Sequence, residues 1–98
     1  MTKAIEIAAN YGEAYYNRGT IFEKMGLQNR AIEDLGRAIA IDEKNYKAYF
    51  HKATALEKIN RREEAIDAFR GFLRYVPPEF KVQIKYAENK IEMLEKEN

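Results

Sequence analysis

One stretch of the chain recurs in altered form 34 residues later, and this period constrains the fold more than any other feature. Residues 15–38 read YYNRGTIFEKMGLQNRAIEDLGRA, and residues 49–72 read YFHKATALEKINRREEAIDAFRGF. When residues 12–45 are compared with 46–79, the identical pairs are Ala14/Ala48, Tyr15/Tyr49, Thr20/Thr54, Glu23/Glu57, Lys24/Lys58, Ala31/Ala65 and Ile32/Ile66. A period of this length is typical of chains built from stacked units, in which no unit buries its apolar face alone.

Each unit is predicted to contain two amphipathic helices. In residues 13–25, positions spaced three or four apart fall on one face of a helix, and they are Tyr15, Arg18–Gly19, Phe22 and Met25. Residues 30–41 carry a second stripe, formed by Ala31, Leu35, Ala38 and Ile39 with Ile32 beside it. Residues 46–59 and 63–75 repeat these two patterns. The sequence therefore predicts four short helices in two pairs.

Glycine and asparagine indicate where these helices end, begin and approach one another. Gly26 is expected to end the first helix because glycine readily adopts left-handed backbone angles. Asn29 and Asn45 are expected to cap the helices that follow them. Gly19 lies inside a helix, where glycine costs ~1 kcal/mol relative to alanine. Because Ala53 occupies the matching position, a small residue there indicates that another helix passes closely.

The beginning of the chain resembles the end of a repeat. Ala4, Ile5 and Ile7 match Ala38, Ile39 and Ile41 at the same offset. This match predicts the last turns of a separate helix whose start belongs to a longer array. A frayed natural N-terminus is the alternative.

Residues 79–96 are predicted to form one longer helix that closes the stack. Its apolar stripe consists of Phe80, Ile84, Ala87, Ile91 and Leu94. Its other face carries Lys81, Lys85, Glu88, Lys90, Glu92 and Glu95. A terminal cap needs this arrangement, because one side meets the core and the other meets water.

Composition narrows the range of functions. The 98 residues suffice for one small domain, and the net charge of +1 supplies no long-range field for nucleic acid or an anionic membrane. The longest uncharged run, residues 7–12, is far shorter than a membrane span. The absence of cysteine excludes disulfides and thiolate chemistry and fits a reducing compartment, so we expect a cytoplasmic location.

The repeat resembles the tetratricopeptide repeat family. In the first helix of each unit an aromatic residue is followed by a small and then a large apolar residue, namely Tyr15, Gly19 and Phe22, and Tyr49, Ala53 and Leu56. The second helices carry Ala31 and Leu35, and Ala65 and Phe69, with Ala38 late in one and the closing Pro77 after the other. The departures from the family pattern are Arg18, Glu43, Lys52 and Phe72.

The resemblance implies an all-α fold of antiparallel helix-turn-helix repeats in a right-handed superhelix with a C-terminal capping helix. The expected division is a truncated repeat at 1–11, full repeats at 12–45 and 46–79, and a capping helix at 80–98. It also implies that the first helices of the repeats line a concave groove that binds a protein or peptide partner. The groove residues that it implies are Glu13, Tyr16, Asn17, Thr20, Lys24, Lys47, Phe50, His51, Thr54, Lys58, Lys81, Lys85 and Glu88.

A subset of these residues resembles the carboxylate clamp with which some members of this family hold an acidic C-terminus. One register uses Asn17, Lys47 and His51, with histidine in place of arginine, and a second uses His51, Lys81 and Lys85, with asparagine missing. Neither register is complete. The alternative is a charged, solvated groove without particular specificity.

Three functional hypotheses remain open at this point. The first is a protein-interaction scaffold that uses the groove, and the second is an assembly module that self-associates through an exposed N-terminal face containing Ile5, Ile7 and Tyr11. The third is a regulatory appendage of a larger enzyme or of a secretion or signalling protein. The lone His51 has no partners at metal-ligand spacing, and no nucleophile–base pair or glycine-rich phosphate loop is present. We therefore expect no catalysis, no metal, no cofactor, no nucleic acid and no membrane insertion by this chain.

Overall fold

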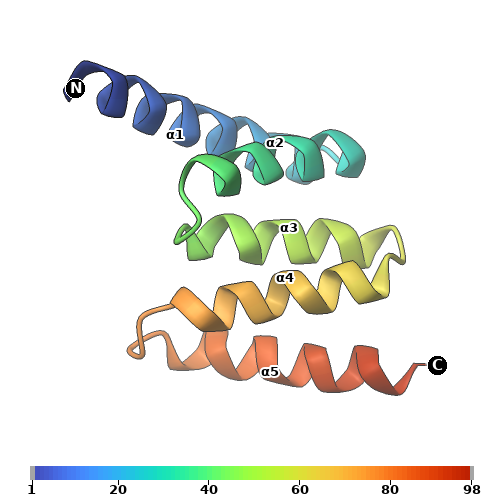
Figure 1. Cartoon of the computed structure of the whole chain (residues 1–98). Coiled ribbons are helices and arrows are strands. Elements are labelled where there is room, and N and C mark those ends of the chain that lie inside the picture. Colours follow the sequence, from blue (N-terminus) through green and yellow to red (C-terminus); the bar gives the residue numbers. More distant parts are fainter. Residues whose placement is uncertain (1, 98) are drawn as a thin grey trace.

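Five helices account for most of the chain in a computed structural model, which describes the backbone of residues 2–97 and the side chains of residues 10–97. They are α1 (Thr2–Lys24), α2 (Gln28–Ile41), α3 (Tyr46–Lys58), α4 (Arg62–Tyr75) and α5 (Lys81–Lys96). Each helix packs against the next in chain order, and α1 also touches α3 (Figure 1). The described part of the chain contains no strand, so the predicted all-α repeat architecture is confirmed.

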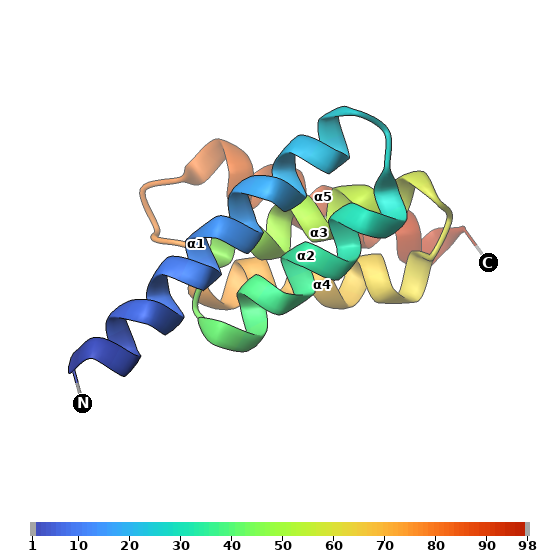
Figure 2. The same ribbon diagram turned by 90° about the horizontal axis from the view of Figure 1, so that it is seen from above.

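The expected break before residue 13 is wrong, because α1 is one continuous helix of 23 residues. Its first turns extend beyond the other helices (Figure 2). The turn between repeats at 42–45 reads DEKN, whereas the matching residues 8–11 read AANY. Alanine favours helix. Residues 8–11 also lack a counterpart of Asp42, whose carboxylate accepts a hydrogen bond from the Lys44 amide in the turn at 42–45. The helix therefore continues through the position where the chain turns 34 residues later.

The helix ends follow the sequence signals in part. Gly26 has a positive φ of 81°, as expected, and Asn60 at the matching position adopts the same conformation with φ 62°. The Asn45 side chain accepts a hydrogen bond from the Ala48 amide at 3.1 Å, which confirms the predicted cap. The predicted Asn29 cap is wrong, because α2 begins at Gln28, follows Leu27 and has no side-chain cap.

The asparagine cap gives a paired test of local stability. Replacement of Asn45 by alanine removes the oxygen that bonds the Ala48 amide, so we expect a loss of about 1 kcal/mol in the free energy of unfolding. Asn29→Ala removes no such bond and serves as the control. Urea denaturation monitored by circular dichroism measures both, and equal losses would contradict the assignment.

The core consists of two adjoining clusters of apolar side chains. The first joins α1, α2 and α3 around Ala31, Leu35, Ala38, Ala48 and Ala55. The second joins α3, α4 and α5, and its largest members are Leu56, Phe69, Phe72 and Leu94. The predicted stripe of α5 is confirmed at its buried positions Ala87 and Leu94. The prediction for Met25 is wrong, since this residue lies in the turn after α1 and is 65% exposed.

Close helix contact explains Gly19. A Cβ atom there would lie 2.8 Å from Leu35 Cγ on α2, a separation that neighbouring atoms do not tolerate without shifting. The glycine thus allows α1 to approach α2 closely, and Ala53 in α3 is fully buried at the matching position. The expectation of a close helix approach at this position is confirmed.

Candidate functional site

An open pocket of about 350 Å³ lies between α1, α3, α4 and α5. Its lining is largely aromatic, and the residues are Tyr16, Tyr46, Lys47, Phe50, His51, Phe72, Phe80 and Gln83. Phe50 and Phe72 approach with ring centroids 5.0 Å apart at a steep angle, and Tyr46 lies 5.7 Å from Phe80. These are favourable edge-to-face or tilted arrangements. Partial burial raises the pKa of Tyr16, so its hydroxyl stays protonated at neutral pH.

The pocket brings together four of the residues expected in the groove, namely Tyr16, Lys47, Phe50 and His51. It does not include Asn17, Lys81 or Lys85, which lie exposed on α1 and α5. Gln83, which sequence reasoning missed, lines the pocket from α5. Tyr46, Phe72 and Phe80 were also missed as site residues, because their helical spacing indicated packing only.

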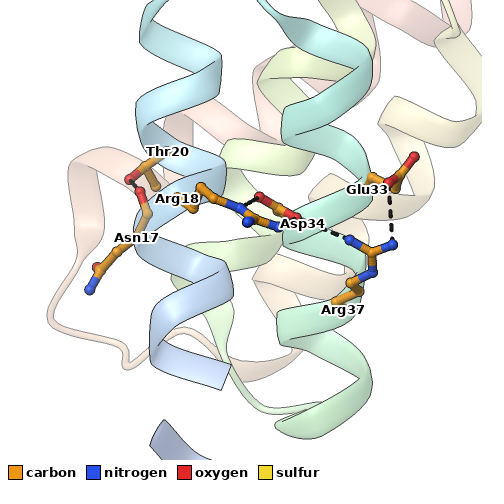
Figure 3. Close-up of polar contacts among 6 residues, drawn as sticks. All are labelled: Asn17, Arg18, Thr20, Glu33, Asp34 and Arg37. Atoms are coloured by element: carbon orange, nitrogen blue, oxygen red, sulfur yellow. Dashed lines mark hydrogen bonds and ion pairs between the residues drawn. The ribbon is translucent and has the colours of Figure 1, made fainter. Parts of the chain in front are cut away.

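The two threonines expected in the groove use their hydroxyls within their own helices. Thr20 Oγ1 donates to the Asn17 carbonyl at 2.8 Å, and Thr54 Oγ1 donates to the Phe50 carbonyl at 3.0 Å. Figure 3 shows the Asn17–Thr20 pair on the side of α1 that points away from α2. Each threonine hydroxyl therefore has its one hydrogen engaged within its own helix and can offer a ligand only acceptor lone pairs.

His51 is tied to the preceding repeat. Its Nδ1 lies 2.8 Å from Glu23 Oε1, and Lys58 Nζ lies 3.7 Å from the other oxygen of this carboxylate. The Glu23 side chain is only 11% exposed, and the Tyr16 ring meets the imidazole edge-on at 5.8 Å. His51 thus fixes the angle between α1 and α3 and at the same time forms part of the pocket wall.

The same contact type recurs one repeat later. Glu57, which matches Glu23, accepts a hydrogen bond from Lys90 Nζ of α5 at 2.7 Å. The pKa of Lys90 is raised, chiefly because of this hydrogen bond. Each repeated glutamate is therefore held by a cation of the next repeat or cap, and the recurrence of Glu23 and Glu57 in sequence was the signal for this role.

A second polar cluster links α1 to α2 and was not anticipated. Arg18 donates to both carboxylate oxygens of Asp34, from Nε at 2.6 Å and Nη2 at 2.9 Å (Figure 3). Arg37 reaches the same carboxylate at 3.3 Å and also contacts Glu33. Asp34 is only 2% exposed, and the hydrogen bond from Arg18 lowers the pKa of its carboxyl group. The pair occurs in the first repeat alone, because Lys52 and Ala68 occupy the matching positions.

Among residues 10–97 no three histidine or acidic side chains gather at a point that could hold a metal ion. In the same part of the structure, none of the helices has the length and apolar character needed to cross a membrane.

Antiparallel helix pairs that stack in chain order, with the first helix of each pair lining one surface, define a helical-repeat domain. Two family models described as tetratricopeptide repeat match residues 12–45 and 46–75. The chain belongs to the tetratricopeptide repeat family, as its sequence predicted. These repeats generally mediate protein–protein interaction and are typically non-catalytic scaffolds.

A solved structure gives an independent measure of this similarity. The TPR domain of Arabidopsis OM64 is 32% identical to the chain, with a TM-score of 0.75. The alignment covers 94% of this chain and 74% of that one. Comparison with curated proteins gave no match.

Proposed function

We propose that the chain binds an extended segment of a protein partner across α1, α3 and α5. The pocket carries this proposal, because its lining includes Tyr16, Lys47, Phe50 and His51, four of the residues that the sequence analysis expected in the groove. Asn17, Lys81 and Lys85 are exposed on α1 and α5, and Thr54 follows Phe50 by one turn on α3, so we include all four in the proposed surface. Apolar rings supply contact area and the lysines supply donors to carboxylates or backbone carbonyls, a combination that suits an extended peptide.

The test uses peptides selected from a displayed random library on the immobilised chain. Lys47→Glu reverses the charge of a pocket residue that is exposed, so we expect it to weaken binding of a selected acidic peptide by roughly tenfold or more, which corresponds to about 1.4 kcal/mol. Lys44→Glu changes the same charge in the exposed turn outside the pocket and is the matched control. Titration calorimetry gives both dissociation constants.

A map of the bound surface decides the outcome. Amide shifts in the labelled protein are expected at Tyr16, Lys47 and His51 when the peptide is added. Shifts confined to α2 and α4, or equal weakening by the two lysine variants, would contradict binding at this surface.

A second proposal, self-association through the outer face of α1, rests on a difference between the repeats. Tyr11 and Ile21 lie on this face and are 58% and 56% exposed, and Met25, in the turn just after α1, is 65% exposed. On α3, Ala55 matches Ile21 and is fully buried in the cluster that α3 shares with α2. We propose that a second copy covers the α1 face in a two-fold symmetric dimer, the commonest closed assembly. The side chains of Ile5 and Ile7, also expected on this face, lie outside the described residues.

Ile21→Lys places a charge in the centre of the proposed dimer interface, so we expect it to shift the sedimentation coefficient to that of a monomer. Val82→Lys is the control, because Val82 is 79% exposed on α5 at the other end of the stack. A monomeric parent protein at high concentration, or loss of association in the Val82 variant instead, would contradict a dimer through α1.

A further inference from the structure

Three aromatic walls of the pocket come from the second repeat and are not all repeated at the matching positions of the first. Tyr46, Phe50 and Phe72 form three of its walls. The matching positions in the first repeat are Gly12, Tyr16 and Ala38, so only one of the three is aromatic there. The pocket is therefore a local feature of this chain rather than a consequence of the repeat itself. Phe72 stands where the family pattern has alanine, and its ring is only 3% exposed.

The shape and lining of the pocket indicate the kind of side chain that it accepts. Its volume of about 350 Å³ falls within the range of small-ligand pockets. Six of the eight lining residues carry rings, and Phe50 meets both Phe72 and Phe69 edge-on, at 5.0 and 6.0 Å. A flat aromatic side chain can extend this edge-to-face pattern, which stabilises a ring pair by about 0.5–1.5 kcal/mol beyond the burial of its area. An aliphatic side chain gains only the burial.

The charges around the pocket indicate what flanks that aromatic side chain. Lys47 and His51 line the pocket, and no aspartate or glutamate does. Lys47 is exposed and forms no ion pair with any side chain between residues 10 and 97. Glu23, the acid that touches His51, is already bound to His51 and Lys58 and is almost entirely buried. The pocket therefore presents a free positive charge beside its apolar walls and complements a carboxylate.

We propose that this pocket selects a partner segment in which an aromatic residue is flanked by acidic residues, with the ring packed against the pocket wall that Tyr46, Phe50, Phe72 and Phe80 form and a carboxylate on Lys47. This proposal rests on the proposed function and specifies the chemistry of its ligand. In this proposal Phe72 and Gln83 help to determine which partner segment binds, although the sequence placed neither residue in the groove.

The chain contains no tryptophan, so a tryptophan in the ligand reports on its own surroundings. The probe is the peptide acetyl-Gly-Asp-Trp-Glu-Gly-amide, and the comparison peptide carries lysine in place of both acidic residues. With selective excitation of tryptophan, the acidic peptide is expected to show a blue-shifted emission on titration with the protein. We expect the lysine peptide to bind at least roughly tenfold more weakly, because its charges face Lys47. The same peptide with alanine in place of tryptophan is tested as a competitor and should compete poorly.

Two variants on α5 locate the bound ring. Gln83→Tyr introduces a bulky side chain at an exposed position of the pocket lining, and Asn89→Tyr makes the same kind of change at an exposed position that does not line the pocket. We expect the first to weaken binding of the acidic tryptophan peptide at least roughly tenfold and the second to leave it unchanged. Circular dichroism confirms that both variants keep the helical fold.

The possible outcomes separate this proposal from the one on which it rests. If the alanine peptide competes as well as the tryptophan peptide, or if the Gln83 variant binds normally, the pocket assignment is overturned while groove binding stands. If the acidic tryptophan peptide does not bind but a library-selected peptide does, the proposed ligand chemistry is overturned alone. If no peptide binds, both proposals are overturned.

Discussion

Replacement of Gly71 by alanine is expected to destabilise the protein, whereas replacement of Gly36 by alanine is expected to stabilise it. Both glycines lie inside helices, where alanine is favoured by about 1 kcal/mol. A Cβ atom at Gly71 would lie 2.4 Å from the Tyr49 ring, and that ring is stacked on Tyr75. At Gly36 a Cβ atom would meet the flexible Lys52 ammonium group at 3.8 Å and, apart from its own helix, no other atom of the described residues within 4 Å.

Overpacking of this kind costs about 1–3 kcal/mol and thus exceeds the gain in helix propensity at Gly71. Because 1 kcal/mol shifts the melting temperature of a domain of this size by roughly 4–8 °C, the two variants should melt on opposite sides of the parent protein. Thermal denaturation by calorimetry measures this. In a Tyr49→Ala background the steric conflict is gone, and Gly71→Ala should become stabilising. A destabilising effect that persists there would contradict the role of the ring.

Arg18→Leu is expected to lower the melting temperature more than Asp34→Ala, although both remove the same ion pair. Asp34 is 2% exposed, so the leucine variant leaves a buried carboxylate with only the longer contact to Arg37. Loss of the main donor to a buried acceptor lowers the free energy of unfolding by about 1–3 kcal/mol. The alanine variant leaves an arginine whose side chain is already 57% exposed and which water can solvate. The double variant should resemble Asp34→Ala, and calorimetry on all three completes the cycle.

The same pair predicts a dependence on acid. The pKa of Asp34 is lowered from its ordinary value of 3.8, first because of the hydrogen bond from Arg18. A carboxyl group with a lowered folded pKa contributes stability that is present above the unfolded value and is lost as pH falls through the folded value. We therefore expect the difference in melting temperature between the parent and Asp34→Asn to narrow below pH 3.8. A difference that is unchanged in acid would contradict this charge effect.

The repeat made most of the fold predictable from the sequence. Helical spacing identified Ala31, Leu35 and Ala38 as core, and small residues at Gly19 and Ala53 indicated the close helix contacts. The continuity of α1 was missed because the match to the end of a repeat suggested a turn, although AANY has two alanines and lacks the aspartate that bonds the Lys44 amide in DEKN. Met25 was misplaced because α1 ends at Lys24, one residue before it.

The candidate site was less predictable for a physical reason. Side chains that meet across helices depend on how far each helix is rotated, which a periodic pattern does not specify to one residue. The Arg18–Asp34 pair spans 16 residues and was visible only as two charges at positions where the other repeat has Lys52 and Ala68. His51 lines the pocket, but its bond to Glu23 depends on the packing of α1 against α3 and could not be read from the sequence. The hypothesis of an enzyme appendage stays a prediction.

The glutamates at the ends of α1 and α3 have a consequence for how the chain opens. Glu57 is bound by Lys90 of α5, and Glu23 is bound by His51 of α3. The glutamate of each repeat therefore finds its hydrogen-bond partner on a helix of the next repeat or of the cap. If α5 detaches, Glu57 remains partly buried without its cation, and the second repeat is weakened at the same time. Hydrogen exchange at α3 and α4 should therefore follow that of α5 in one cooperative step, rather than each helix opening independently.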